Sequence, residues 1–140
     1  MKIYNLDKQD RELIEEGLVT AKRGFVDDRK NRIGCDLAGA LITKSGKIFT
    51  GINLDVKSSA GASICGERSA IMHMISQAER TIETIVAVWI SRDYNKNKKW
   101  GILQPCGICR HVISQFGDPW VIISKSKKVK LNELYPLPVK

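Results

Sequence analysis

Four side chains in two short segments have the types and the spacing of a catalytic metal site. Cys65 and Glu67 lie in the first segment, and Cys106 and Cys109 lie in the second. A zinc ion bound by three thiolates keeps its fourth coordination position for water, and a carboxylate that is not a ligand can move the protons of that water. The pattern therefore predicts a hydrolytic zinc site in which the three cysteines hold the metal and Glu67 is the catalytic acid and base.

The spacing of these residues predicts that they lie at the ends of two helices. Cys106 and Cys109 are at positions i and i+3, so on the first turn of a helix they lie on one side and can bind one ion. Pro105 precedes that turn, where its missing N–H does no harm. Cys65 and Glu67 are at positions i and i+2 and would diverge on the flank of a helix, but at its N-terminal end both can bend toward one point. We therefore expect two helix N-termini to converge on the metal.

Three thiolates around Zn²⁺ leave a net negative charge that has to be offset. This charge makes the metal a weaker acid than one with neutral histidine ligands, for which bound water reaches a pKa of about 7. Each helix N-terminus supplies about half a positive charge. Arg68 or Arg110, which lie in the two motifs, could also donate hydrogen bonds to the sulfurs.

The elements that would position these residues alternate between strand and helix. Apolar residues recur at helical spacing over 7–25, where acidic residues come early and basic residues late, as the helix dipole favours. The pattern further predicts strands over 37–43, 47–54, 84–91 and 120–123, helices over 65–78 and 107–116, a helical turn over 131–134, and loops over 26–34, 57–63 and 92–99. Strands that alternate with helices indicate a layered α/β fold, and 140 residues suit a single domain over 1–140.

Composition and charge narrow the class of protein. No stretch is apolar and long enough for a signal peptide or a membrane span, so we expect a cytoplasmic protein with no membrane partner. Thiols in a reducing compartment serve metals or catalysis more often than disulfides, and Cys35, outside the two motifs, is expected to be a buried core thiol. The net charge of +8 hints at a polyanionic partner, but the basic residues are spread over four clusters, which is typical of a solvated surface.

The two motifs resemble those of the small cytidine deaminases. Residues 65–70 are Cys-Gly-Glu-Arg-Ser-Ala and residues 105–112 are Pro-Cys-Gly-Ile-Cys-Arg-His-Val, which match the zinc-deaminase signature with cysteine in place of the first histidine. A looser likeness to blasticidin S deaminase runs through residues 46–53 and 101–106. The resemblance implies a three-layer α/β/α sandwich around a mixed sheet of about five strands. It also implies one zinc ion per subunit and a homotetramer in which neighbours complete each pocket.

The resemblance also implies a reaction and a set of residue roles. Water activated by zinc would attack C4 of the ring of cytidine or deoxycytidine, with Glu67 passing a proton from the water to N3 and later protonating the amine that leaves as ammonia. The backbone of Gly66 would face the ring carbonyl, the backbone carbonyl of Gln104 would meet the departing amine, and Asn53 would hold the sugar. Arg68 stands where the three-cysteine cytidine deaminases have an arginine that blasticidin S deaminase lacks.

Three features of the chain depart from the pattern of the cytidine deaminases. Asp55 stands where the family has a glutamate, and its side chain is one methylene shorter for reaching a ribose hydroxyl. The stretch from Asn53 to Cys65 is one residue longer. Near Cys35 and Val139 the chain lacks the aromatic residues that wall the base pocket in the family. These departures leave a related aminated nucleoside or heterocycle, such as blasticidin S, as an alternative substrate.

Other interpretations of the motifs remain open. A closed structural zinc site would need a fourth protein ligand, for which His111 is nearer to the cysteines than His73. Editing of a base in a nucleic acid would use the same zinc chemistry, but the nine aromatic residues are not interleaved with basic ones, which disfavours a nucleic-acid partner. A catalytically dead binding protein is disfavoured by the intact Glu67. Of the tryptophans, Trp100 is the best placed to contact a substrate, since it lies beside the loop that leads into the second motif.

Overall fold

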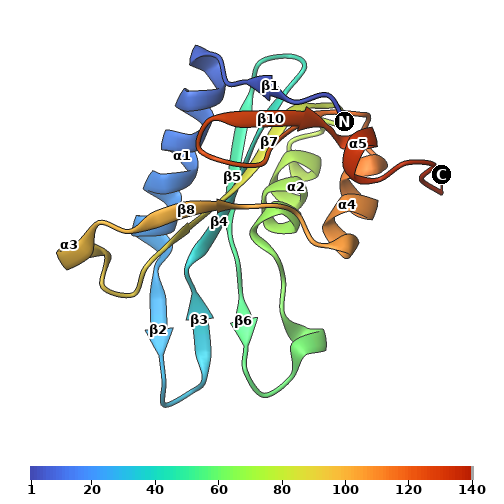
Figure 1. Ribbon diagram of the computed structural model, residues 1–140. Helices are drawn as coiled ribbons and strands as arrows, with labels where there is room; N and C mark the ends of the chain where they lie inside the picture. Colours follow the sequence, from blue (N-terminus) through green and yellow to red (C-terminus); the bar gives the residue numbers. More distant parts are fainter. Residues whose placement is uncertain (140) are drawn as a thin grey trace.

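The computed structural model describes residues 1–139, which form three layers (Figure 1). Helix α1 packs on one face of a β-sheet, and helices α2 and α4 pack on the other. The strands are β1 (Tyr4–Asn5), β2 (Val26–Asp28), β3 (Ile33–Cys35), β4 (Leu37–Thr43), β5 (Ile48–Ile52), β6 (Asp55–Val56), β7 (Ile82–Ile90), β8 (Trp100–Leu103), β9 (Trp120–Ile122) and β10 (Lys127–Lys130). The helices are α1 (Lys8–Gly24), α2 (Gly66–Ser76), α3 (Tyr94–Asn97), α4 (Gly107–Ser114) and α5 (Leu131–Leu134), with a 3₁₀ turn, η1 (Ala60–Ala62). The expected α/β/α sandwich is confirmed.

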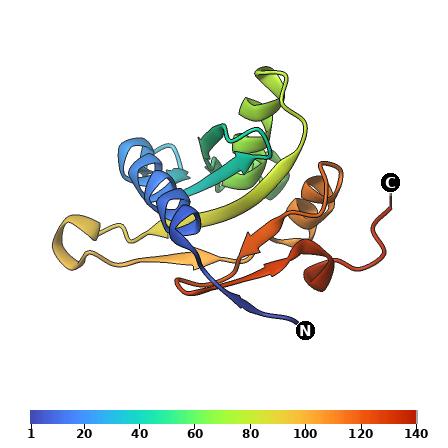
Figure 2. The same cartoon turned by 90° about the horizontal axis from the view of Figure 1, so that it is seen from above.

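The main sheet has seven strands in the order β1-β10-β9-β7-β4-β5, with β8 also paired to β7. Strand β7 is the centre of this sheet. On one edge it pairs with β4, and on the other edge its first part runs parallel to β9 while its last part runs antiparallel to β8. The parallel pair makes the sheet mixed, as expected. Because β8 and β9 share one edge of β7, the chain leaves the sheet between them, and this exit leads into the second cysteine motif (Figure 2).

Helix α1 is specified by its N-terminal cap and its apolar face. The side chain of Asp7 accepts a hydrogen bond from the N–H of Asp10, and the side chain of Asp10 accepts one from the N–H of Asp7, each at 2.9 Å. The Asp10 carboxylate also lies 2.7 Å from the ammonium of Lys128, which ties the start of α1 to β10. The apolar face packs on small and branched residues of β4 and β7. The main members of this first core are Leu13, Ile14, Leu18, Ala21, Ala38, Ala40, Val86 and Val88.

A second core lies on the opposite face of the sheet, beneath α2, α4 and α5. Its largest members are Leu41, Phe49, Ile71, Met74, Ile82, Ile85, Ile113 and Leu131. Full burial of each such side chain favours the fold by about 1.5–3 kcal/mol relative to exposure. Cys109 belongs to this core and is fully buried, so the apolar side chains that hold α4 in place also hold one of the candidate metal ligands.

Helix α2 begins in direct contact with β4. A Cβ added to Gly39 would lie 2.3 Å from the carbonyl oxygen of Gly66 and 2.6 Å from the amide nitrogen of Glu67. A Cβ added to Gly66 would lie 2.6 Å from the amide nitrogen of Gly39. Any side chain at either position would push the two backbones apart. The two glycines therefore set the distance between the sheet and the first turn of α2.

The sheet is larger than the sequence predicts. Residues 26–34, expected as a loop, form the hairpin of β2 and β3, which joins β6 in a separate three-stranded sheet. Strands β1 and β10 pair with each other at the edge of the main sheet. These strands are short, and most of their residues are polar, so backbone pairing rather than apolar periodicity specifies them. The main sheet therefore has seven strands where about five are expected, since β1 and β10 are short and mostly polar and β8 is a further strand that is not among the predicted ones.

The helices lie close to their predicted bounds. The helix expected over 7–25 begins at Lys8, and the helices expected to start at 65 and 107 begin at Gly66 and Gly107. The helical turn over Leu131–Leu134 is also present. In the described part of the chain, no helix combines the length and the apolar character that a membrane span requires.

Replacing Gly39 by alanine should destabilise the fold. The new methyl group would overlap backbone atoms of α2 that cannot move without displacing its first turn, so we expect the free energy of unfolding to fall by about 1–3 kcal/mol. Gly61→Ala is the matched control, because a Cβ added there meets nothing within 4 Å. Urea unfolding measures both variants, and equal stabilities would contradict the close contact between β4 and α2.

Candidate active site

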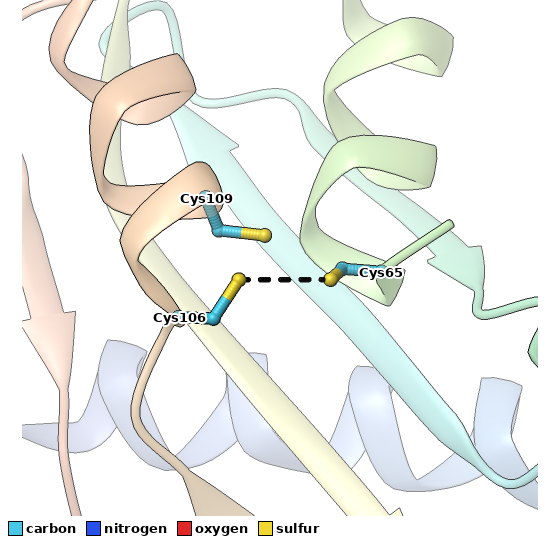
Figure 3. Close-up of side chains that lie close together, drawn as sticks. All are labelled: Cys65, Cys106 and Cys109. Carbon is cyan, nitrogen blue, oxygen red and sulfur yellow. Dashed lines mark hydrogen bonds between the residues drawn. The ribbon is translucent and has the colours of Figure 1, made fainter. Parts of the chain in front are cut away.

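Three sulfur atoms from two helix ends converge on one point (Figure 3). Cys65 is the N-cap residue of α2, and Cys106 is the N-cap residue of α4, whose first turn carries Cys109. The three Sγ atoms lie within 4.8 Å of one another, and those of Cys65 and Cys106 are 3.9 Å apart. The two helix N-termini therefore meet as the spacing of the motifs predicts.

The distances between the sulfurs fit a tetrahedral zinc ion. Thiolates at a Zn–S distance of about 2.3 Å stand about 3.8 Å apart around a tetrahedral metal, close to the 3.9 Å between Cys65 and Cys106. Cys109 is buried, Cys65 is half-buried and Cys106 is exposed, so the cluster lies where one side of it can meet solvent. The donor set and its spacing therefore suit zinc.

Neither histidine supplies a fourth ligand. Nδ1 of His111 lies 3.0 Å from the hydroxyl of Tyr135, and the two rings pack edge to face. Nδ1 of His73 lies 3.3 Å from the carbonyl oxygen of Thr50. Among residues 1–139, the one group of cysteine, histidine or acidic side chains close enough to hold a metal consists of the three cysteines. The site thus has the open position that a catalytic zinc requires.

Burial acts to raise the pKa values of the Cys106 and Cys109 thiols, whereas hydrogen bonds at the start of α4 act to lower that of Cys106. Burial raises the pKa of the Cys109 thiol far above its usual value, and the charges of Glu67 and Cys65 raise it further. Burial also opposes ionisation of Cys106, but hydrogen bonds from the Cys109 N–H, the thiols of Cys109 and Cys65 and the Ile108 N–H together outweigh it and lower the Cys106 pKa. Neighbouring thiolates repel one another, so without a metal some of the three thiols keep their protons. A bound cation would have to displace these protons.

Glu67 lies on the first turn of α2 and is only 4% exposed. Apolar residues line the space beside it, among them Ile85, Leu103 and Pro105. Burial raises the pKa of the Glu67 carboxyl, while its own N–H and the charge of Arg68 act in the opposite direction. A carboxyl that is removed from water in this way holds its proton more readily than an exposed one, which suits a group that has to take up and release a proton.

Arg68 lies against the first sulfur. Its Nη2 is 3.8 Å from Sγ of Cys65 and 3.5 Å from the carbonyl oxygen of Ser63. The hydrogen bond to Cys65 raises the pKa of the Arg68 guanidinium. Nε of Arg68 is buried and has no hydrogen-bond partner in the described chain. The guanidinium thus places a permanent positive charge next to the cysteine cluster.

Arg110 does not follow the expectation that it contacts a sulfur. Its Nε donates to the carbonyl oxygen of Pro105 at 2.8 Å, and its Nη1 donates to the carbonyl oxygen of Leu134 at 3.0 Å. Consecutive residues of a helix point about 100° apart. With Cys109 directed at the other cysteines, the next side chain is therefore directed away from them.

Asn53 and Asp55 lie at the end of β5 and in β6, where they serve the backbone and the surface. Oδ1 of Asn53 accepts hydrogen bonds from the N–H groups of Asp36 and Leu37, at 2.9 and 3.1 Å. Its Nδ2, which is 3.4 Å from Asp36 Oδ1, can still donate to another group. Asp55 forms an ion pair with Lys57 and lines a surface cleft on the small sheet, whereas Glu67 lines the apolar space beneath α2 and α4.

Gly66 and Gln104 each adjoin a cysteine-bearing helix end. Gly66 is the first residue of α2, and Gln104 is exposed between β8 and Pro105. Strand β8 also presents Leu103, which is 50% exposed and lines the space beside Glu67. Neither β8 nor Leu103 is among the predicted elements and site residues, although the apolar run over residues 100–103 indicates a strand.

Cys35 and Trp100 lie outside the cysteine cluster. Cys35 is buried, as predicted, and burial raises the pKa of its thiol. Trp100 packs against the core beneath α1, and the ammonium of Lys125 lies 4.0 Å from the centre of its ring. That core is on the opposite face of the sheet from the cysteines. Trp100, the tryptophan best placed by sequence to contact a substrate, is therefore a partly buried residue of the core beneath α1 in this chain.

Known proteins resemble this chain over most of its length. The family model for the cytidine and deoxycytidylate deaminase zinc-binding region matches residues 7–125. Blasticidin-S deaminase from Bacillus cereus is 31% identical over 142 residues, which cover 98% of this chain and 96% of that protein. A probable cytidine deaminase from Dictyostelium discoideum is 36% identical over 89 residues, which cover 64% of this chain and 55% of that protein. The crystal structure of cytidine deaminase from Burkholderia pseudomallei has a TM-score of 0.72 at 22% identity and covers 96% of this chain and 100% of that chain.

The similarity in sequence and the similarity in structure support different conclusions. At 22% identity the crystal structure shows that the fold is shared. The family match spans both cysteine motifs, and the metal named in its description is the one that the three sulfurs fit. The chain belongs to the cytidine and deoxycytidylate deaminase zinc-binding family, whose members are enzymes that hydrolyse C–N bonds.

Proposed function

We propose that this protein deaminates free cytosine nucleosides and converts cytidine or deoxycytidine to uridine or deoxyuridine and ammonia. The observation that carries the proposal is the burial of Glu67 beside three convergent sulfur atoms that leave one metal position open. One zinc ion per chain would be bound by Cys65, Cys106 and Cys109. Arg68 would offset part of the thiolate charge through its hydrogen bond to Cys65.

Glu67 would carry the protons of the reaction. When bound, zinc would act as a Lewis acid and lower the pKa of water enough for the water to react at neutral pH. Glu67 takes a proton from this water as the water oxygen bonds to C4 of the ring, and delivers the proton to ring N3. It then transfers the second proton of the water to the amino group. The C4–N bond breaks, ammonia leaves, and the keto form of the ring remains.

Four other residues would bind the substrate. The backbone of Gly66 would face the ring carbonyl, and the backbone carbonyl of Gln104 would accept a hydrogen bond from the departing amine. Asn53 would contact the sugar through Nδ2, because its Oδ1 is already used by two backbone N–H groups. Asp55 would have to exchange its ion pair with Lys57 for a sugar hydroxyl.

The chain would act as one deaminase domain over residues 1–140, assembled as a homotetramer in the cytoplasm and serving pyrimidine salvage. Support for self-association comes from apolar side chains that stand exposed near the cysteines: Ile64 at 43%, Leu103 at 50% and Ile108 at 62%. Neighbouring subunits that cover these residues would remove apolar surface from water. They would also shield the site from bulk solvent.

A second substrate class is favoured by one comparison. The blasticidin-S deaminase of Bacillus cereus matches 98% of this chain, whereas the probable cytidine deaminase of Dictyostelium discoideum matches 64%. Arg68 favours the cytidine enzymes, since it occupies the position of the arginine in their three-cysteine motif. An aminated heterocycle such as blasticidin S is therefore the alternative substrate. Editing of nucleic acids is the least favoured of the three.

Ammonia release from cytidine, deoxycytidine, cytosine and blasticidin S tests the proposal on the purified, zinc-loaded protein. We expect the highest kcat/KM for one of the two nucleosides, because Asn53 would add a sugar contact that free cytosine lacks. Selective turnover of blasticidin S would replace the proposed substrate by the alternative. Turnover of none of these compounds would contradict the proposed function.

The same assay on Glu67→Gln separates enzymatic turnover from background. The amide keeps the shape of the side chain but cannot move protons, so kcat should fall at least about a hundredfold while zinc stays bound. Glu12→Gln is the matched control, since this side chain is 63% exposed on α1. A Glu67→Gln variant with the turnover of Glu12→Gln would rule out the role assigned to Glu67.

Replacing a metal-binding cysteine by serine should release zinc. Cys65→Ser, Cys106→Ser and Cys109→Ser each remove one of three thiolates, so the zinc content of the purified protein should fall well below one ion per chain. Cys35→Ser is the control within the same chain, because Cys35 is buried away from the cluster and should leave the zinc content unchanged. Atomic absorption measures both.

The affinity of the wild-type protein for zinc should also depend on pH. The raised pKa of Cys109 keeps this thiol protonated at neutral pH in the absence of metal, so zinc has to displace its proton. The affinity should therefore rise about tenfold per pH unit for each proton displaced. A zinc affinity that does not change between pH 6 and pH 8 would contradict this assignment of the ligands. In the measurement of zinc content, loss of zinc only in Cys35→Ser would contradict it as well.

A further inference from the structure

The guanidinium of Arg110 joins two carbonyl groups from different parts of the chain. Nε donates to Pro105 at 2.8 Å, and Nη1 donates to Leu134 at 3.0 Å. Pro105 precedes the N-cap residue of α4, and Leu134 is the last residue of the single turn α5. Pro105 lies outside α4, and the carbonyl of Leu134 is at the C-terminal end of α5, so neither carbonyl accepts a hydrogen bond within a helix. A planar guanidinium can satisfy both at once, because its N–H groups form a rigid fork.

The first of these hydrogen bonds closes a ring around two candidate metal ligands. The ring runs from Pro105 through Cys106 and Cys109 to the side chain of Arg110. Cys106 is extended, with φ −68° and ψ 173°, whereas Cys109 is within the helix. Closing the ring thus fixes the angle between the extended residue and the first turn of α4. The relative position of the two sulfurs depends on this angle.

The second hydrogen bond connects this ring to the C-terminal segment, residues 131–139. The segment makes two further contacts, one with α4 and one with its C-cap residue: His111 Nδ1 lies 3.0 Å from the Tyr135 hydroxyl, and Gln115 Nε2 donates to the carbonyl oxygen of Val139 at 2.9 Å. Figure 1 shows α5 and the following residues beside α4. Leu131 is buried in the core beneath the helices, so the segment is anchored at its start.

We propose that Arg110 is a positioning residue that holds Cys106 and Cys109 at metal-binding distance by clamping their segment to the C-terminal segment. The inference rests on the proposed metal site. It divides the two arginines by role: Arg68 contacts a sulfur and acts through its charge, whereas Arg110 contacts carbonyls and acts through geometry. The C-terminal segment thereby influences the metal through Arg110.

Lysine and glutamine substitutions separate geometry from charge. Arg110→Lys keeps the positive charge but replaces the fork by a single ammonium on a flexible stem, which cannot reproduce both hydrogen bonds in the same geometry. Arg110→Gln removes the charge as well. If geometry matters, both variants should lose zinc faster, and if charge alone matters, only Arg110→Gln should do so.

The experiment follows zinc release from the loaded full-length protein into excess chelator, with a colorimetric zinc indicator. We expect release to be about ten to a hundred times faster in both Arg110 variants than in the wild type, the range typical for losing a residue that orients metal ligands. Arg80→Lys is the matched control and should release zinc at the wild-type rate. Arg80 donates from Nη1 to two backbone carbonyls, those of Ile75 and Glu79, at the far end of α2.

Circular dichroism identifies a temperature at which all variants are folded, and release is compared there. Wild-type release from Arg110→Lys, alone or together with Arg110→Gln, would overturn the clamp, as would equally fast release from Arg80→Lys. A failure of the proposed function is recognised separately, because it shows as absent zinc or absent turnover in the wild-type protein. If only the clamp proposal fails, the wild-type protein still binds zinc and still turns over substrate.

Discussion

The first turn of α2 lies against β4 at a distance that a side chain on Gly39 or Gly66 would not permit. This contact sets where Cys65 and Glu67 stand above the sheet. The second helix end reaches the same point by another route, because β8 leaves the edge of β7 and leads directly to Cys106. Burial of Cys109 in the core shared by α2 and α4 completes the convergence. The candidate metal site is thus a product of backbone packing, with the cysteines placed at the ends of elements that the core holds.

The same arrangement brings together groups that become negatively charged on ionisation, and it places positive and partly positive groups beside them. Three thiols and a buried carboxyl lie close together, and burial raises the pKa values of Glu67 and Cys109. Hydrogen bonds from N–H groups of α4 and from the neighbouring thiols lower the pKa of Cys106, and the guanidinium of Arg68 lies beside Cys65. A divalent cation would complete the compensation, since it favours the thiolate forms directly. The apolar surroundings that disfavour charge on Glu67 are also what suit this group to proton transfer.

The residues at the centre of the site were predictable because their chemistry and spacing are local properties of the sequence. The starts of the helices that follow Cys65 and Cys106 were predicted within one residue. Helix geometry already directs Arg110 away from the sulfurs, but the sequence could not show its partner, because Leu134 is 24 residues away. Strands β1 and β10 were missed since their short polar segments pair only through tertiary contacts. The apolar run over residues 100–103 could indicate β8, but the side of the sheet that Trp100 faces follows from the pairing of β8 with β7.

The central claim is that three sulfur ligands surround one metal and leave a position for a small molecule. X-ray absorption at the zinc edge of the loaded protein tests it most directly. The structure predicts three sulfur ligands at about 2.3 Å and one oxygen ligand at about 2.0 Å, without the scattering pattern of an imidazole ring. Four protein ligands, such as three sulfurs with a histidine, or fewer than three sulfurs, would contradict the account.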